Sequence, residues 1–170
     1  MKDIVIIDDF LTQEELIHIQ DENSYKDKTW ILHGSFPQGK EMIEDFHTSF
    51  LQKDLMDNEY YTSYLLKKIN KTFNYNYKLV DVYLNGHEAL RHGSFHTDGN
   101  ADRTVIFYIT PWQPSWGGFT QFMRSEKDYT IVPPILGRLV NFRSDILHKG
   151  YAFCNQNCPM RITAAFKLKL

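Results

Sequence analysis

The second half of the chain, from about residue 77 onward, consists of short runs in which apolar and polar residues alternate. A period of two places successive side chains on opposite faces of a strand and is typical of β-structure with one buried face. Turn residues separate the runs, which predict strands at 77–84, 89–91, 95–97, 104–110, 119–123, 130–132, 138–142, 147–153 and 161–169. Short strands at this spacing predict the two packed sheets of a jelly roll, whose Greek-key connections bring distant residues together.

The N-terminal part of the chain has a different pattern. An apolar run at 4–8 predicts a short buried strand, and Thr12 with Glu15 forms a capping box that opens a helix to about residue 21. From 49 to 57, and again from 59 to 72, apolar residues recur with helical spacing. The chain is therefore expected to be mainly β with N-terminal helices. A helical cover over about 10–73 would pack on a jelly-roll core over about 75–170.

Residues 26–45 show no steady period. Gly34, Pro37 and Gly39 predict a loop there, with a short strand near 30–32. Loops of this length are often functional, so whether this one closes over a substrate is an open question.

Composition excludes several other classes of protein. The 170 residues suit a single domain, 1–170, with a full hydrophobic core. The net charge is -2 and the basic residues are scattered, so no surface for nucleic acid or a membrane is expected. The apolar run at 4–7 is too short for the core of a signal peptide, and no stretch has transmembrane length, which predicts a cytoplasmic protein.

Cys154 and Cys158 lie four residues apart, and no further cysteine or histidine completes a zinc pattern around them. A small disulfide loop and two free thiols are both compatible with this spacing. A reducing cytosol favours free thiols.

Candidate chemistry centres on His96 and Asp98. In an extended strand these two side chains point to the same face. His148 follows far enough along the chain for a later strand to return to the same point. Two imidazoles and one carboxylate on one side of a metal leave the other side open, which suits non-haem Fe(II) chemistry with oxygen. A bare His-x-Asp pair also fits a surface turn, so the metal hypothesis needs further support.

That support comes from the last predicted strand. Arg161 and Thr163 share one face with Ala165, and that face is therefore expected to be half buried. A half-buried Arg needs an anionic partner. A dicarboxylate bound by the guanidinium fork, with a hydroxyl beside it, would provide one. The alternative is an Arg paired with an acid on the neighbouring strand.

Together these motifs resemble the ordered landmarks of the Fe(II)/2-oxoglutarate-dependent dioxygenases, and within them the prolyl 4-hydroxylase-like group. The resemblance covers about 81–170, with a weaker similarity at 6–11. One departure is Arg161, where prolyl 4-hydroxylases usually carry Lys. The landmarks are His96-Thr97-Asp98, Trp116 to Phe122, Gly137 to Phe142, His148 and Arg161-Ile162-Thr163.

The resemblance implies a double-stranded β-helix core and assigns roles to particular residues. His96, Asp98 and His148 would be both the metal ligands and the catalytic centre, with Fe(II), 2-oxoglutarate and O2 as cofactors and cosubstrates and ascorbate as an optional reductant. The cosubstrate would be bound through four residues: Arg161, Thr163, Tyr83 and Thr120. For Tyr83 an ordinary core tyrosine is an equal alternative, and Thr120 is also compatible with a plain strand residue after a glycine turn.

The favoured activity is hydroxylation of a C–H bond in a prolyl residue of a peptide or protein. A free amino acid or another small molecule is the first alternative substrate. A cupin-like metal-binding module without turnover is a different class of answer, because fold alone does not fix function. An oxygen sensor in a regulatory complex would use the same site.

Overall fold

The computed structural model describes residues 2–22, 29–35 and 48–170. The helices in this part are α1 (Gln13–Glu22), the π-helix η1 (Tyr60–Leu65), α2 (Leu66–Phe73) and the 3-10 helix η2 (Pro114–Trp116). The strands are β1 (Ile4–Ile7), β2 (Ile31–Ser35), β3 (Thr48–Asp54), β4 (Lys78–His87), β5 (Arg103–Tyr108), β6 (Thr120–Ser125), β7 (Asp128–Val132), β8 (Leu139–Arg143), β9 (Leu147–Gly150) and β10 (Arg161–Lys169).

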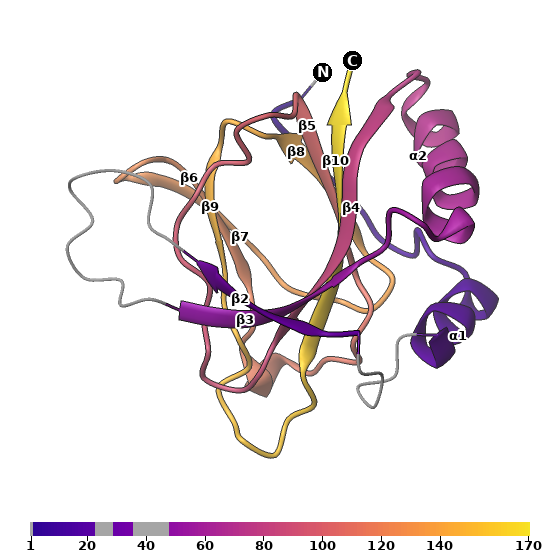
Figure 1. Ribbon diagram of the computed structural model, residues 1–170. Helices are drawn as coiled ribbons and strands as arrows, with labels where there is room; N and C mark the ends of the chain where they lie inside the picture. Colours follow the sequence, from indigo (N-terminus) through magenta and orange to yellow (C-terminus); the bar gives the residue numbers. More distant parts are fainter. Residues whose placement is uncertain (1, 23–28, 36–47) are drawn as a thin grey trace.

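These strands form two facing sheets (Figure 1). The larger sheet has the order β1-β8-β5-β10-β4-β3-β2, and the smaller has the order β7-β6-β9. From β4 onward the chain passes repeatedly between the sheets, so that β10 lies between β4 and β5. An isolated bridge between His96 and His148 adds the segment around His96 beside β9. This interleaving is the topology of a jelly roll, and the predicted double-stranded β-helix core is confirmed.

Alternation along the strands of the larger sheet divides the core into two layers. On β10, Ala164, Phe166 and Leu168 face the helices and pack with Leu16 and Ile19 of α1, among others. Figure 1 shows α1 and α2 on this outer side of the larger sheet. Ala165 faces the opposite way and packs between the two sheets with residues such as Ile106 and Phe142. Arg161, Thr163 and Lys167 share the face of Ala165, so the strand period places them between the sheets.

The predicted capping box opens α1. The Thr12 amide donates to Glu15 Oε2 at 2.7 Å, and the Glu15 amide donates to Thr12 Oγ1 at 3.2 Å. The second predicted helix is also present, as η1 continued by α2. It ends at Asn74, whose φ of 52° is the left-handed conformation that commonly closes a helix.

Several predicted elements are different in the structure. Residues 49–57 were expected to be helical, but 48–54 form β3, which pairs antiparallel with β4 and β2. The helical cover over about 10–73 is therefore interrupted by two strands. Residues 89–91 are not a strand, and 95–97 contribute only the bridge at His96. Of the loop predicted over 26–45, residues 29–35 are described and contain β2; the rest, including any lid, lies outside the described residues.

Two smaller expectations can also be compared with the structure. Cys154 and Cys158 are both free thiols. Within the described part of the chain, no helix has the length and apolar character needed to cross a membrane.

Candidate metal and cosubstrate site

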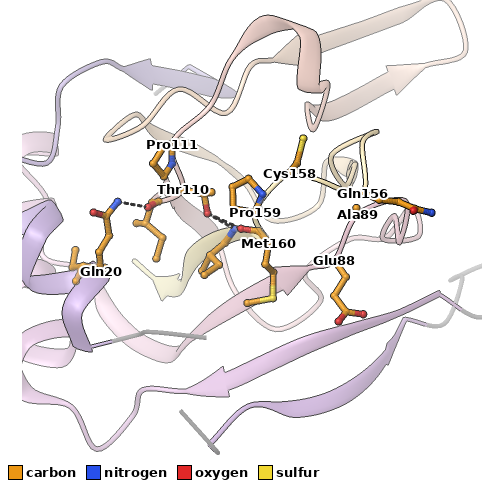
Figure 2. A pocket seen from close by; sticks show the side chains of 12 residues that line it. Gln20, Glu88, Ala89, Thr110, Pro111, Gln156, Cys158, Pro159 and Met160 are labelled. Atoms are coloured by element: carbon orange, nitrogen blue, oxygen red, sulfur yellow. Dashed lines mark hydrogen bonds between the residues drawn. The ribbon is translucent and has the colours of Figure 1, made fainter. Parts of the chain in front are cut away.

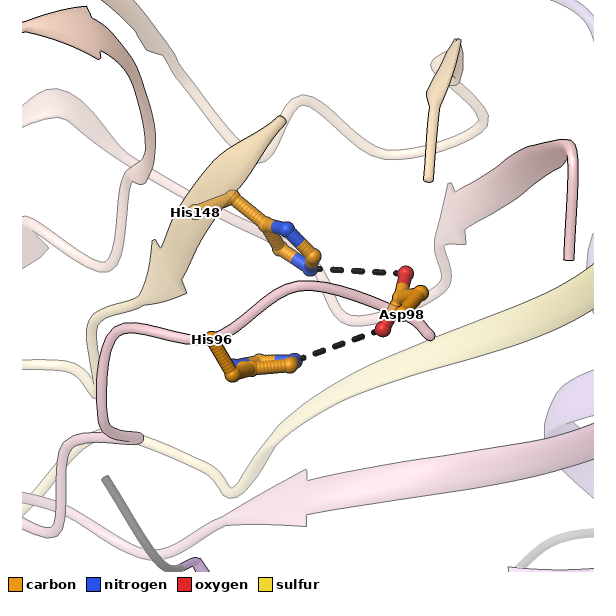
Figure 3. Close-up of side chains that lie close together, drawn as sticks. All are labelled: His96, Asp98 and His148. Carbon is orange, nitrogen blue, oxygen red and sulfur yellow. Dashed lines mark ion pairs between the residues drawn. The ribbon is translucent and has the colours of Figure 1, made fainter. Parts of the chain in front are cut away.

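The backbone brings the three predicted metal ligands together. His96 and His148 are opposed in an antiparallel bridge, with amide-to-carbonyl distances of 3.0 and 2.9 Å in the two directions. The Asp98 amide donates to the Ser144 carbonyl at 2.8 Å, which holds the residues after His96 along the approach to β9. Figure 3 shows the three side chains converging from these two segments. One potential ligand atom from each residue lies within 4.8 Å of the others.

The histidine rings are held in the orientation that a metal needs. Nδ1 of His96 lies 2.9 Å from the Ser94 carbonyl, and Nδ1 of His148 lies 2.9 Å from the Ile146 carbonyl. A carbonyl oxygen can only accept, so each Nδ1 carries a proton, and Nε2 is the nitrogen left to bind a metal. The two Nε2 atoms lie 3.5 and 3.6 Å from the Asp98 carboxylate. Backbone carbonyls that fix the tautomer in this way are typical of metal-binding histidines.

The Asp98 carboxylate is buried and strongly held. Its Oδ2 accepts from Thr104 Oγ1 at 2.6 Å and lies 2.5 Å from Lys167 Nζ. Burial opposes ionisation of this carboxyl, but the Lys167 charge and the hydrogen bonds from Lys167 and Thr104 lower the pKa of Asp98 to about 2. The carboxylate is therefore ionised at neutral pH.

His148 is the more deeply buried of the two histidines. Burial lowers the pKa of His148 to about 4, although the Asp98 charge opposes the shift. The imidazole is therefore neutral at physiological pH, as a metal ligand must be. Two imidazoles whose Nε2 atoms face one ionised carboxylate fit a divalent metal of the Fe(II) type with three positions left open.

A cavity of about 100 Å³ lies between the sheets beside these residues. Its floor is formed by β4 and β10, whose register places facing pairs of side chains on the same side of the sheet. His96, His148 and Lys167 line the same cavity as Arg161. Two of the three predicted metal ligands, His96 and His148, and the predicted cosubstrate residue therefore open onto one space. The pairs along the floor are Arg161 with His87, Thr163 with Asn85, and Ala165 with Tyr83.

Arg161 is almost fully buried at one end of this floor, with 2% of the residue exposed. Its Nε donates to the Gly118 carbonyl at 2.7 Å, and its Nη2 donates to Thr120 Oγ1 at 2.9 Å. Within the described residues, no carboxylate forms an ion pair with it. Burial accordingly lowers the pKa of Arg161, and the only opposing effects come from Tyr108. The structure thus holds a buried cation that lacks an anion, as expected for a site that binds one.

The glycine before β6 is required by this arrangement. Gly118 has a φ of 76°, and a Cβ at this position would lie 2.4 Å from the Phe153 ring. Any side chain would therefore displace the carbonyl that accepts from Arg161. The predicted glycine turn therefore holds the carbonyl that positions Arg161 at the predicted cosubstrate site.

The other predicted cosubstrate residues line the same cavity, each at a different point. Thr120 accepts from both Arg161 and the Tyr108 hydroxyl, which lies 2.8 Å away. Thr163 faces the cavity two residues after Arg161. Tyr83 lies nearer the metal end, where the Lys167 ammonium is 5.7 Å from its ring centre. Their roles toward a cosubstrate remain predictions.

Among the cavity residues that the sequence did not predict are His87, Asn85 and Lys167. His87 Nδ1 lies 3.1 Å from the Arg91 carbonyl, and burial lowers the pKa of His87 to about 3, so its ring is neutral beside Arg161. Asn85 Oδ1 is buried and has no hydrogen-bond partner among the described residues. An orphan polar atom in a cavity is a further sign of a ligand-binding site. A signal existed for Lys167, which continues the alternation of Arg161 and Thr163 along β10.

A larger cavity of about 580 Å³ lies near the end of α1, where it is bordered by residues flanking β5 and β10 (Figure 2). Its inner polar groups already bond one another or the backbone. Gln20 donates to the Ile109 carbonyl at 2.9 Å, and the Thr110 hydroxyl donates to the Met160 carbonyl at 3.0 Å. Its described lining contains no histidine and only one carboxylate, that of Glu88. Size alone therefore does not identify the chemical site; the smaller cavity is the one lined by His96, His148 and Arg161.

Fold and site together define a jelly roll with a His-Asp-His cluster between its sheets, whose ligand atoms lie close enough together to hold a metal ion. No protein-family model and no curated protein matches the chain. Solved structures match it over nearly its full length. A 2OG-Fe(II) oxygenase family protein from Burkholderia pseudomallei has a TM-score of 0.75 at 9% identity, covering 98% of this chain and 84% of its own.

Two prolyl hydroxylases also match. The enzyme from Trichoplax adhaerens, in complex with a hypoxia inducible factor peptide fragment, has a TM-score of 0.71 at 17% identity and covers 98% of this chain and 83% of its own. The viral collagen prolyl hydroxylase from Paramecium Bursaria Chlorella virus-1 has a TM-score of 0.66 at 18% identity, covering 98% and 96%. The chain therefore shares its fold with 2OG-Fe(II) oxygenases.

Proposed function

We propose that this chain is an Fe(II)- and 2-oxoglutarate-dependent oxygenase that hydroxylates a C–H bond. The observation that carries the proposal is the buried Arg161, which pairs with no carboxylate of the described residues and lies in the same cavity as His96 and His148. A metal-binding barrel without turnover has no need of a buried cation. A dicarboxylate that binds the metal at one end and a guanidinium at the other accounts for both features.

The proposal gives each side chain a task. His96, Asp98 and His148 hold Fe(II), and their tautomers and charges suit this without change. Arg161 binds the distal carboxylate of 2-oxoglutarate, with the Thr163 hydroxyl beside it. With O2 present, the bound iron supplies oxidative decarboxylation of 2-oxoglutarate to succinate and CO2, and one oxygen atom enters the C–H bond of the substrate.

Thr120 and Tyr83, the remaining two predicted residues, take different roles. Thr120 acts through Arg161, because its oxygen already accepts from the guanidinium. Tyr83 faces the metal end of the cavity, where it would contact the part of the cosubstrate nearest the metal or the substrate itself.

The favoured substrate is a prolyl residue in a peptide. Support comes from the resemblance of the sequence motifs and from the two prolyl hydroxylases that share the fold. A free amino acid or another small molecule is the alternative. Both would use the same ligands, so the substrate itself must separate them.

The first experiment is an assay of succinate formation with Fe(II), ascorbate and 2-oxoglutarate, with and without proline-rich peptides. We expect turnover that peptides stimulate, with one oxygen atom added to proline by mass spectrometry. Asp98→Ala is the matched control and is expected to be inactive. Turnover without peptide stimulation would reject the prolyl substrate and keep the oxygenase. No succinate from folded, iron-loaded protein would reject the oxygenase.

A further inference from the structure

The buried Lys167 ammonium contacts Asp98, one of the three candidate metal ligands. Lys167 is six residues after Arg161 on the same face of β10. Its side chain is 13% exposed, the Asp98 side chain is 4% exposed, and Nζ lies 2.5 Å from Asp98 Oδ2. Lys167 also lines the cavity. Neither the sequence motifs nor the proposed reaction gives this residue a role.

The charges around Asp98 explain what the ammonium does. Both imidazoles donate Nδ1–H to the backbone, the deeply buried His148 is neutral, and Thr104 gives Asp98 a neutral hydroxyl. Asp81 faces Lys167 across the strands but does not line the cavity. Among the described residues, Lys167 is the Lys or Arg that forms an ion pair with Asp98, and it compensates the buried carboxylate when no metal is present. A buried carboxylate without such a partner would be strongly destabilising.

The two carboxylate oxygens have different surroundings. Oδ2 accepts from both Thr104 and Lys167, whereas Oδ1 faces His96 Nε2 at 3.5 Å. The ammonium and the hydroxyl thus fix the rotation of the carboxyl group. They leave Oδ1 directed toward His96, while His148 Nε2 lies 3.6 Å from Oδ2.

We propose that Lys167 is the internal counter-ion of the metal centre: it neutralises and orients Asp98 in the metal-free protein, so that the three ligands are preformed before the metal binds. This inference rests on the proposed function only in naming the metal. Lys167 is a positioning residue, because it acts on the metal through Asp98.

The test measures thermal unfolding without metal and with excess Mn(II), which does not oxidise readily. Lys167→Met keeps most of the aliphatic stem and removes the charge. We expect its metal-free Tm to fall by on the order of 10 °C. We also expect Mn(II) to raise its Tm by more than it raises that of the wild type, because the metal restores the missing positive charge. Lys169→Met, the same change at an exposed position on the same strand, should alter neither value. Lys167→Arg should recover most of the metal-free stability.

A double-mutant cycle with Asp98→Asn keeps the test decisive if Lys167→Met does not fold without metal. Each single change leaves one buried charge unpaired, whereas the double variant leaves none, so it should be more stable without metal than either single variant. Additive losses of stability in the double variant would overturn the counter-ion role of Lys167. An equal rise in Tm with Mn(II) in the wild type and in Lys167→Met would overturn it too. Coupling between the two residues in a protein that binds no Mn(II) would instead keep the ion pair and reject the metal centre.

Discussion

At the scale of single residues, the site is prepared by backbone groups. The carbonyls of Ser94 and Ile146, each two residues before a histidine, select the tautomer that leaves Nε2 free. The Gly118 carbonyl fixes the orientation of the Arg161 guanidinium by accepting from its Nε. Main-chain acceptors held by the sheets lose little entropy when they orient these side chains, so the ligands are preorganised.

The clearest residue-scale prediction concerns Arg161. Arg161→Met should weaken 2-oxoglutarate binding to the Mn(II)-loaded protein by about 100-fold or more, because a charge-assisted, two-point contact is lost. The 2-oxoglutarate affinity of Arg161→Lys should fall between those of Arg161→Met and the wild type, since Lys keeps the charge but not the two-point contact of a guanidinium. Isothermal titration calorimetry measures both.

The control is Arg138→Met, which removes an Arg that pairs with Asp8 away from the cavity. It should leave 2-oxoglutarate affinity unchanged. Mn(II) affinity should be similar in all the variants. If Arg161→Met bound 2-oxoglutarate as the wild type does, the cavity would be wrongly assigned.

How much of the site the sequence predicts depends on how local each signal is. The His96 and Asp98 pair is predictable because two positions in an extended segment share a face, and Arg161 with Thr163 follows the same rule. Lys167 lies on the same face of that strand and could have been predicted in the same way. His87 was not, because the strand was expected to end at residue 84 and β4 extends to His87 through pairing with β10. That extension is decided by a neighbour distant in sequence.

At the scale of helices and strands, a local signal led to a correct prediction, whereas pairing with a distant segment was missed. The capping box of α1 is a four-residue signal and is confirmed. The segment 49–57 fits a helical period, yet 48–54 form β3 because β4 presents a free edge for pairing. Strand propensity depends on such partners more than helix propensity does, and one sequence does not show them.

The helices are tied to one another by a group that also caps α1. Glu15 accepts from Tyr64 of η1 at 2.8 Å and from Lys68 of α2 at 2.5 Å, besides the Thr12 amide. Burial opposes ionisation, but these hydrogen bonds outweigh it and lower the pKa of Glu15. The charge of one residue therefore joins three helical elements on the outer side of the larger sheet.

Glu15→Gln should lower the free energy of unfolding at pH 7 by roughly 1–3 kcal/mol, because it removes a buried charged acceptor. The folded pKa lies below the unfolded value of about 4.3, so this contribution is present above that pH and is lost as the pH falls through the folded pKa. The difference between variant and wild type should therefore shrink in acid. Urea unfolding at pH 7 and near pH 3 measures it.

The matched control is Glu14→Gln, the adjacent exposed carboxylate in the same helical turn. Its effect at pH 7 should be within about 0.5 kcal/mol. A difference for Glu15→Gln that stayed constant with pH would show that shape rather than charge ties the helices.

At the scale of the whole molecule, the larger sheet has two separate duties. Its outer face carries the helices and most of the apolar core, and its inner face carries the charged cavity. Alternation along β4, β5 and β10 keeps these layers apart, so a change in the cavity need not disturb the helical side. Ligands that bind the cavity join the two sheets and should therefore stabilise the entire fold.

Stepwise stabilisation by ligands follows from this arrangement. Mn(II) at about 100 times its Kd should add about 2.7 kcal/mol, or roughly 5–11 °C in Tm for a chain of this size. 2-Oxoglutarate should raise the Tm further only when the metal is present, because it needs both the metal and Arg161. Arg161→Met should respond to Mn(II) alone, and Asp98→Ala to neither ligand. An equal response to 2-oxoglutarate with and without metal would place its binding outside the cavity that His96, His148 and Arg161 line.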